Sequence, residues 1–142
     1  MPLKISSRAL VEQAMAEVTT LRAEEVKARL ADPLQAARLQ LVDIRDVREL
    51  SGGTPVGSVH APRGMLEFWV DPESPYFKPV FGDECKDYVL FCALGWRSAL
   101  STKTLQDMGM RNVAHVEGGF EALKAAGLPL ESLEARKAAK GA

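Results

Sequence analysis

The chain has 142 residues, of which 46% are hydrophobic and 26% charged, a composition typical of one soluble folded domain. The 18 Lys and Arg residues balance the 19 Asp and Glu residues to a net charge of −1, which argues against a nucleic-acid binder. The sequence contains no apolar run near the ~20 residues that cross a bilayer. Its first residues also lack the apolar core of a secretory signal. We therefore expect a cytoplasmic protein with neither a nucleic-acid nor a membrane partner.

Cysteine and histidine are scarce. The two cysteines, Cys85 and Cys92, are too few for a disulfide scaffold, and with two histidines they are poor material for a structural zinc site. We expect no metal and no disulfide. An extended strand over 88–92, which separates the two cysteines, would be about 13 Å long, because strands rise ~3.3 Å per residue. A disulfide needs Cα atoms within ~7 Å, so we expect Cys85 to be an unpaired loop cysteine.

Two helices are expected in the first quarter of the chain. Apolar residues at helical spacing predict the first from about Ser7, with a stripe formed by Leu10, Val11, Ala14, Met15 and Val18. The second is predicted over 23–30. Its acidic residues Glu24 and Glu25 lie in the first turn, as the helix dipole favours, and Pro33 follows its end.

Short apolar runs then alternate with helical segments. Strands are predicted over 39–43, 57–60, 88–92 and 113–116, with a fifth over 18–21. Helices are predicted over 98–108 and 120–126, each followed by glycine. This alternation predicts an α/β fold in three layers, in which helices flank a mostly parallel sheet of about five strands. Ligands of such sheets bind at the carboxyl ends of the strands.

Three segments do not follow this alternation. Residues 63–69 predict a short helix, and residues 71–87, with three prolines, predict a long excursion outside the core. Residues 131–142 are rich in Ala, Lys, Arg and Glu and predict a frayed helix or loose tail. We divide the chain into an N-terminal helix (1–17), one domain (18–130) and a polar C-terminal tail (131–142).

Cys92 ends the most apolar strand and is followed at once by a predicted helix. A strand, a tight loop and a helix N-terminus direct backbone N–H groups at one point. Gly95 can adopt the positive φ that such a loop needs, Ser98 can cap the helix, and Arg97 adds positive charge. This setting favours the thiolate. Cys92 is therefore the candidate nucleophile; the alternative is a buried structural cysteine.

The segment after the strand resembles the active-site signature of the rhodanese (sulfurtransferase) family in its single-domain form. The signature Cys-x-x-Gly-x-Arg-Ser is present at residues 92–98. Further similarity lies in Leu41-Val42-Asp43-Ile44-Arg45 with Glu49, Gly57-Ser58-Val59-His60-Ala61-Pro62, Leu105-Gln106-Asp107-Met108-Gly109 and Val116-Glu117-Gly118-Gly119-Phe120. The resemblance spans about residues 18–129 and implies a rhodanese-like fold.

The resemblance implies a sulfur relay with no cofactor besides a covalent persulfide on Cys92. The cysteine would take a sulfane sulfur from a donor such as thiosulfate and pass it to a thiophilic acceptor, cyanide or a thiol. The active-site loop would be formed by Ala93, Leu94, Gly95, Trp96, Arg97 and Ser98. Arg97 would bind an anionic donor or fix the loop through an acidic partner. Trp96 would form an apolar rim, which suits an organic or protein persulfide donor.

Several other residues are expected near the mouth of the predicted site. Asp43 is a candidate pocket neighbour at a strand end, and Arg63 is a second one, after the turn at 60–62. Arg45 and Glu49 are expected to be structural partners. The two histidines, His60 and His115, are not needed beside Cys92, because loop amides stabilise an anion without a base.

Two other functions stay open. Phosphatases that share the general plan of this fold have five residues between the cysteine and the arginine of their loop, whereas four residues separate Cys92 from Arg97. This shorter loop disfavours a cysteine-dependent phosphatase or arsenate reductase. The other alternative is a non-catalytic rhodanese-like interaction module, although such domains often lack the cysteine that this chain has.

Overall fold

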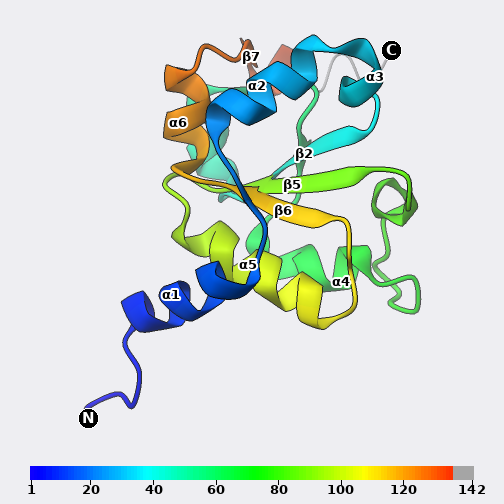
Figure 1. Cartoon of the computed structure of the whole chain (residues 1–142). Helices are drawn as coiled ribbons and strands as arrows, with labels where there is room; N and C mark the ends of the chain where they lie inside the picture. Colours follow the sequence, from blue (N-terminus) through cyan, green and yellow to red (C-terminus); the bar gives the residue numbers. More distant parts are fainter. Residues whose placement is uncertain (136–142) are drawn as a thin grey trace.

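A five-stranded parallel sheet lies at the centre of the molecule (Figure 1). The computed structural model describes residues 1–135. The strand order is β1-β6-β5-β2-β4, with bounds Thr20–Leu21, Val113–Val116, Asp87–Phe91, Leu39–Asp43 and Val59–His60. All four neighbouring pairs are parallel. The expected α/β fold with a mostly parallel sheet of about five strands is confirmed.

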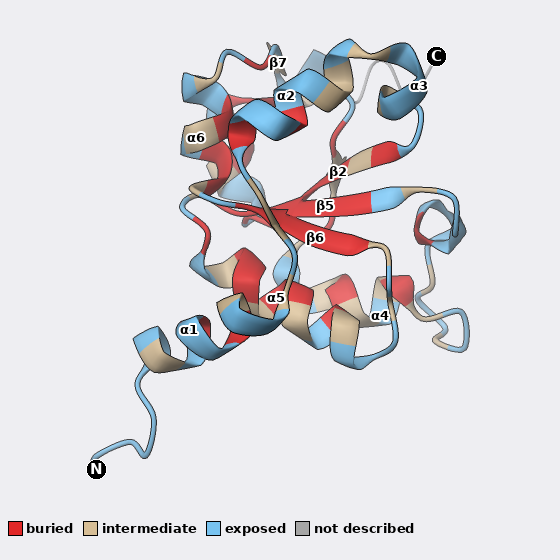
Figure 2. Ribbon diagram, viewed as in Figure 1, coloured by how far each residue is buried: buried red, intermediate tan, exposed pale blue. Residues whose placement is uncertain are grey.

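Helices cover both faces of this sheet (Figure 1). One face carries α1 (Ser7–Glu17), α4 (Leu66–Val70) and α5 (Trp96–Asp107), and the other carries α2 (Ala23–Ala31), α3 (Pro33–Ala36) and α6 (Gly119–Ala125). The central strands are consequently buried on both sides (Figure 2). Val42 and Leu90 pack toward α4 and α5, while Leu41, Val89 and Phe91 pack toward α2 and α6. This explains why these strands read as continuous apolar runs.

A second, two-stranded sheet ties the end of the domain to its middle. Strand β3 (Thr54–Pro55) pairs antiparallel with β7 (Leu130–Glu131). Neither strand was expected, and Glu131 belongs to β7 rather than to a loose tail. The rest of that predicted tail lies within the described residues only as far as 135, and residues 136–142 are outside them.

The proline-rich excursion is held against the core. It contains the 3-10 helix η3 (Pro79–Gly82), in which Phe81 is buried. The Tyr88 hydroxyl donates to the Val80 carbonyl at 2.6 Å and accepts from the Asp83 N–H at 3.1 Å. Two further 3-10 helices, η1 (Val47–Gly52) and η2 (Arg63–Met65), follow β2 and β4. Within residues 1–135 no helix combines the length and apolar character needed to span a bilayer.

Candidate active site

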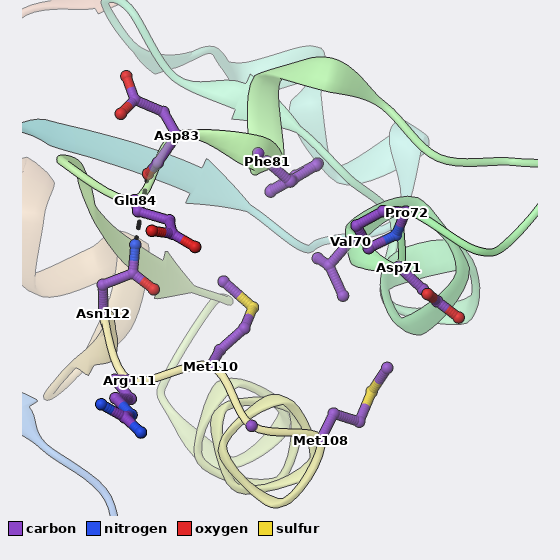
Figure 3. Close-up of a pocket in the computed structure, with 12 residues that line it drawn as sticks. Val70, Asp71, Pro72, Phe81, Asp83, Glu84, Met108, Met110, Arg111 and Asn112 are labelled. Atoms are coloured by element: carbon purple, nitrogen blue, oxygen red, sulfur yellow. Dashed lines mark hydrogen bonds between the residues drawn. The ribbon is translucent and has the colours of Figure 1, made fainter.

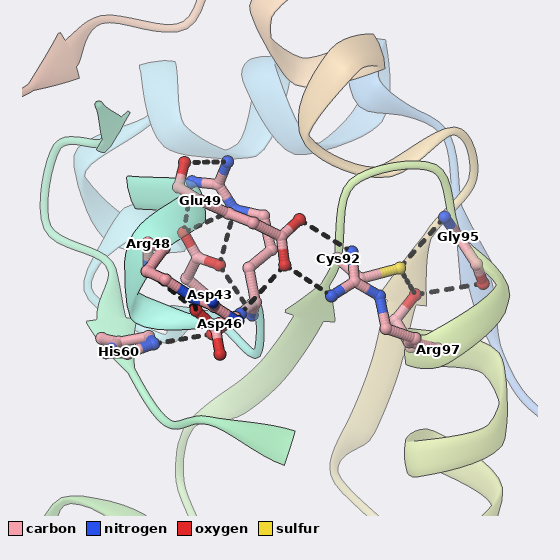
Figure 4. Close-up of polar contacts among 10 residues, drawn as sticks. Asp43, Asp46, Arg48, Glu49, His60, Cys92, Gly95 and Arg97 are labelled. Carbon is pink, nitrogen blue, oxygen red and sulfur yellow. Dashed lines mark hydrogen bonds and ion pairs between the residues drawn. The ribbon is translucent and has the colours of Figure 1, made fainter. Parts of the chain in front are cut away.

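Cys92 lies immediately after β5, at the carboxyl end of the central strand (Figure 4). Gly95 has φ +115° and forms the N-cap of α5, so the loop turns back over the sulfur. Its N–H donates to Cys92 Sγ at 3.1 Å. The predicted strand, loop and helix N-terminus therefore converge on this one atom. A side chain at position 95 would have to adopt a backbone conformation that only glycine enters freely.

The loop shifts the ionisation of Cys92 toward the thiolate. Burial of the thiol raises its pKa, because a charge loses hydration there. Hydrogen bonds from the Ser98 hydroxyl and from the N–H groups of Ser98, Gly95 and Leu94 outweigh burial, and together they lower the pKa below its ordinary value. Hydroxyl and amide donors thus stabilise negative charge on the sulfur.

Ser98 has a different role from the one expected. Helix α5 begins at Trp96, so Ser98 lies within its first turn and does not cap it. The Ser98 hydroxyl instead lies 3.6 Å from Cys92 Sγ and 3.2 Å from the Gly95 carbonyl oxygen. Because Gly95 in the left-handed conformation ends the loop without a side-chain cap, the serine hydroxyl is free to face the sulfur.

Arg97 is held by an acidic partner. Its Nη1 and Nη2 donate to Glu49 Oε1 and Oε2 at 2.7 and 3.0 Å (Figure 4). These hydrogen bonds are the main cause of the lowered pKa of Glu49 and of the raised pKa of Arg97. A smaller contribution to the Arg97 shift comes from negative charge on Cys92, which puts the guanidinium within electrostatic reach of the sulfur. This geometry favours a role for Arg97 in fixing the loop over a role in binding an anionic donor.

The segment that carries Glu49 is anchored by a buried ion pair. Arg45 Nη2 donates to Asp43 Oδ2 at 2.8 Å, and Thr54 Oγ1 donates to the same oxygen at 2.9 Å. Arg45 also donates to the carbonyl oxygens of Glu49 and Gly53. The Asp43 side chain is 0% exposed. Contrary to the expectation of a pocket neighbour, Asp43 is therefore a buried structural residue that holds the η1 segment through Arg45.

The turn after β6 packs against the backbone of Cys92, a contact that was not predicted from the sequence. The Phe120 N–H donates to the Cys92 carbonyl at 2.7 Å. Gly119 has φ +57°, and a Cβ there would collide with the Cys92 carbonyl oxygen and lie 2.8 Å from the Ala93 carbonyl carbon. The adjacent pair of glycines after a predicted strand was the available signal. This contact fixes the start of the loop, at the backbone of Cys92 and Ala93.

The surface of the loop is apolar while its sulfur is buried. Cys92 is 1% exposed, whereas Leu94 is 70% and Trp96 50% exposed. Ala93 is half-buried. Arg63 follows β4 and is exposed, and its N–H donates to the Ile44 carbonyl at 3.2 Å. Arg63 and Cys92 thus both lie at the carboxyl ends of the parallel strands.

The two histidines have separate surroundings. His60 Nε2 lies 2.8 Å from the Arg45 carbonyl oxygen, as expected for a satisfied strand-end histidine. His115 is 1% exposed on β6, and its Nδ1 lies 3.1 Å from Ser98 Oγ. The Ser98 hydroxyl therefore lies between His115 and Cys92.

Both cysteines are free thiols, with Cys85 exposed and Cys92 buried. Within residues 1–135, no three His, Cys, Asp or Glu side chains are grouped as metal ligands.

A separate open cavity of about 550 Å³ lies near the amino ends of β5 and β6, whereas Cys92 follows the carboxyl end of β5 (Figure 3). It is lined by the segments that precede β5 and β6 and by the end of α4, including Val70, Phe81, Glu84, Met108 and Met110. None of the site residues predicted from the sequence lines it. The loop around Cys92 is therefore the better candidate for chemistry.

The chain is similar in sequence to proteins of one known family. The model of the Rhodanese-like domain matches residues 23–126. The chain is 29% identical over 121 residues to thiosulfate sulfurtransferase GlpE of Glaesserella parasuis, covering 85% of this chain and 97% of that protein. It is 26% identical over 105 residues to Rhodanese-like/PpiC domain-containing protein 12, chloroplastic, of Arabidopsis thaliana. That match covers 74% of this chain but only 33% of the relative, so the chain spans about a third of its length.

Solved structures show the same fold. A protein of unknown function from Rhodopseudomonas palustris, described as a possible tyrosine phosphatase, is 44% identical with a TM-score of 0.83, over 92% of this chain and 98% of that one. A rhodanese-related protein from Thermoplasma volcanium is 25% identical with a TM-score of 0.62, over 80% and 97%. Thiosulfate sulfurtransferase from Pseudomonas aeruginosa, at 20% identity and a TM-score of 0.63, shares the fold over 82% of this chain and 20% of its own.

Proposed function

Because this chain belongs to the rhodanese family, we propose that it is a sulfurtransferase that carries sulfane sulfur as a persulfide on Cys92. The observation that carries the proposal is the Gly95 N–H, which donates to Cys92 Sγ at 3.1 Å within a loop that lowers the pKa of that thiol. Successive amides and a helix N-terminus suit a small anion such as the outer sulfur of a persulfide.

The reaction has two steps. In the first, the Cys92 thiolate attacks the sulfane sulfur of the donor. A bond forms between Sγ and that sulfur, and the donor's own bond to it breaks, so the leaving group departs with the electron pair; from thiosulfate this group is sulfite. In the second, cyanide or a thiolate attacks the outer sulfur, the disulfide-type bond breaks and the Cys92 thiolate is restored. No oxidant, metal or organic cofactor takes part, and we expect ping-pong kinetics.

Binding of the sulfur donor is expected to depend little on positive charge in the site. Arg97 is already paired with Glu49 by two hydrogen bonds, and the exposed loop side chains are Leu94 and Trp96. Thiosulfate should therefore be accepted with modest affinity. An organic or protein persulfide, whose apolar part can contact Leu94 and Trp96, is the better candidate for the physiological donor. A cytoplasmic location is part of the proposal, because a reducing compartment protects a thiolate from oxidation.

Intact mass after incubation with thiosulfate tests the proposal. The wild-type protein should gain the mass of one sulfur atom, and cyanide should remove it. Cys92→Ala should gain none, while Cys85→Ala, which alters the other and exposed thiol, should behave as wild type. An unchanged wild-type mass with thiosulfate and with an organic persulfide would contradict the proposal and favour a non-catalytic interaction module.

A phosphatase is the second candidate, because the Rhodopseudomonas palustris protein described as a possible tyrosine phosphatase is 44% identical to this chain. Two features argue against it here. Only four residues separate Cys92 from Arg97, and Glu49 already occupies both terminal nitrogens of Arg97 that a phosphate would need. Hydrolysis of an aryl phosphate by the purified protein, abolished by Cys92→Ser, would establish the phosphatase instead.

A further inference from the structure

A chain of hydrogen-bonding side chains runs inward from β1 to the candidate nucleophile. Thr20 Oγ1 lies 3.0 Å from His115 Nε2, and these residues are register partners on adjacent strands. On the other side of the ring, His115 Nδ1 lies 3.1 Å from Ser98 Oγ. Ser98 Oγ is in turn 3.6 Å from Cys92 Sγ. Two strands and helix α5 thus contribute one side chain each to a line that ends on the sulfur.

His115 is in a setting that keeps its ring uncharged. It is 1% exposed, and burial lowers its pKa to about 4. At neutral pH one ring nitrogen therefore donates a hydrogen bond and the other accepts one. An imidazolium would donate from both nitrogens, and its charge would be costly in this position.

The proton positions follow from the charge on the sulfur. A thiolate accepts only, so the single proton of the Ser98 hydroxyl is drawn to Cys92 and away from the Gly95 carbonyl. The Ser98 oxygen then needs a donor, which is the Nδ1–H of His115. Nε2 is left as an acceptor for the Thr20 hydroxyl. In this arrangement every group donates toward the sulfur.

We propose that His115 is a positioning residue for Cys92: as the neutral Nδ1–H tautomer, set by Thr20, it fixes the Ser98 hydroxyl as a donor to the thiolate. This inference rests on the proposed function, in which the Cys92 thiolate is the nucleophile. The arrangement involves no proton transfer. His115 itself does not touch the sulfur or a substrate, and its effect passes through Ser98.

The charged side chains on the surrounding elements offer no alternative explanation for the tautomer. Those on α5, β5 and α1 are Arg97, Lys103, Asp107, Asp87, Arg8, Glu12 and Glu17, and each is partly or fully exposed. Strand β1 has none. The ring is therefore oriented by the two hydroxyls.

The first test is the pH profile of Cys92 alkylation by iodoacetamide in a Cys85→Ala background. His115→Phe removes the donor to Ser98 and should raise the midpoint of the profile by about one pH unit, the size expected for weakening one charge-assisted hydrogen bond. His115→Asn retains an amide N–H at the Nδ1 position and should stay close to wild type. Thr20→Val should give a smaller increase, because it frees the tautomer without removing the ring.

The second test observes the tautomer directly, in the folded wild-type protein. Nitrogen NMR of the imidazole at neutral pH should show Nδ1 protonated and Nε2 bare. Cys92→Ser, which replaces the thiolate by a neutral hydroxyl, should shift the ring toward a mixture of tautomers. A bare Nδ1 in the wild type, or a midpoint unchanged in His115→Phe, would overturn the proposal. The intact-mass experiment is independent, since sulfur loading can succeed or fail whatever the tautomer is.

Discussion

The carboxylate of Glu49 binds both terminal nitrogens of Arg97, at 2.7 and 3.0 Å, although 48 positions separate the two residues in the chain. The pair joins η1 to the first turn of α5. Since Arg97 is two residues beyond the Gly95 N–H that faces Cys92, the pair holds the cysteine loop closed at its helical side. Gly119 and Phe120 hold the strand side.

The first prediction concerns this pair. Arg97→Lys retains the positive charge but can match only one carboxylate oxygen at a time, so the loop should loosen. We expect persulfide formation on Cys92 to slow about tenfold, corresponding to ~1.4 kcal/mol in the transition state. The measurement is the rate of sulfur loading by quenched intact-mass analysis.

Arg48→Lys is the matched control. Arg48 lies on the same η1 segment and pairs with Asp46, but its side chain is 88% exposed. It should load sulfur at the wild-type rate. Full activity of Arg97→Lys would mean that the charge, rather than the paired geometry, is what the loop needs.

The second prediction concerns Gly119. Gly119→Ala should lower stability by more than the ~1–3 kcal/mol of an unfavourable backbone conformation, because the new methyl meets the Cys92 and Ala93 backbone. Gly57→Ala is the control, since Gly57 also has a positive φ, +85°, but nothing within 4 Å of an added Cβ. Urea unfolding compares the two. Equal losses would show that the turn after β6 does not press on the loop.

How much of this site follows from the sequence can be judged residue by residue. Cys92, its loop and the positive φ of Gly95 depend on a contiguous segment, and the structure places them at the expected strand end. The start of α5 was expected at Ser98 but is at Trp96, because Gly95 ends the loop without a side-chain cap. Local sequence cannot show that Ser98 then faces the sulfur.

Contacts between distant segments do not follow from local sequence patterns. His115 is 17 positions from Ser98 and 95 from Thr20. The register of β1 with β6 brings Thr20 to His115, and the packing of α5 against β6 brings Ser98 to it. Strands β3 and β7 have two residues each and pair across the domain, which is too little for a period-two pattern. Asp43 looked like a pocket residue because it ends a strand, yet its partner Arg45 is only two positions away.

The third prediction follows from that pair. Asp43→Asn leaves Arg45 buried without its counter-charge and should cost about 3–5 kcal/mol of stability. Because Asp43 does not line the loop, the KM for thiosulfate of the folded protein should be unchanged. Asp46→Asn, in the exposed pair with Arg48, should change stability little. A raised KM in fully folded Asp43→Asn protein would show that Asp43 lines the substrate pocket.

The fourth prediction is a pH dependence of stability. The pKa of His115 is about 4 in the native state and about 6.5 when unfolded. Between these values the unfolded chain binds a proton that the native protein does not, so stability falls as pH falls from about 6.5 to about 4. The loss should approach about 3 kcal/mol.

Urea unfolding of the wild type and His115→Asn, across that pH range, isolates this contribution. Carboxylate titrations are common to both proteins and cancel in the difference of their unfolding free energies. The wild-type advantage should shrink steadily on acidification. A difference independent of pH would mean that the imidazole titrates normally in the native protein.

The lowered pKa of the Cys92 thiol is the central claim, and its titration tests it most directly. In Cys85→Ala, which leaves one thiol, the rate of alkylation is followed from about pH 5 to about pH 10, with Cys85→Ala/Cys92→Ala as the blank. We expect a midpoint clearly below the ~8.5 of an ordinary cysteine, since loop amides and Ser98 outweigh burial. A midpoint at or above that value would contradict the account.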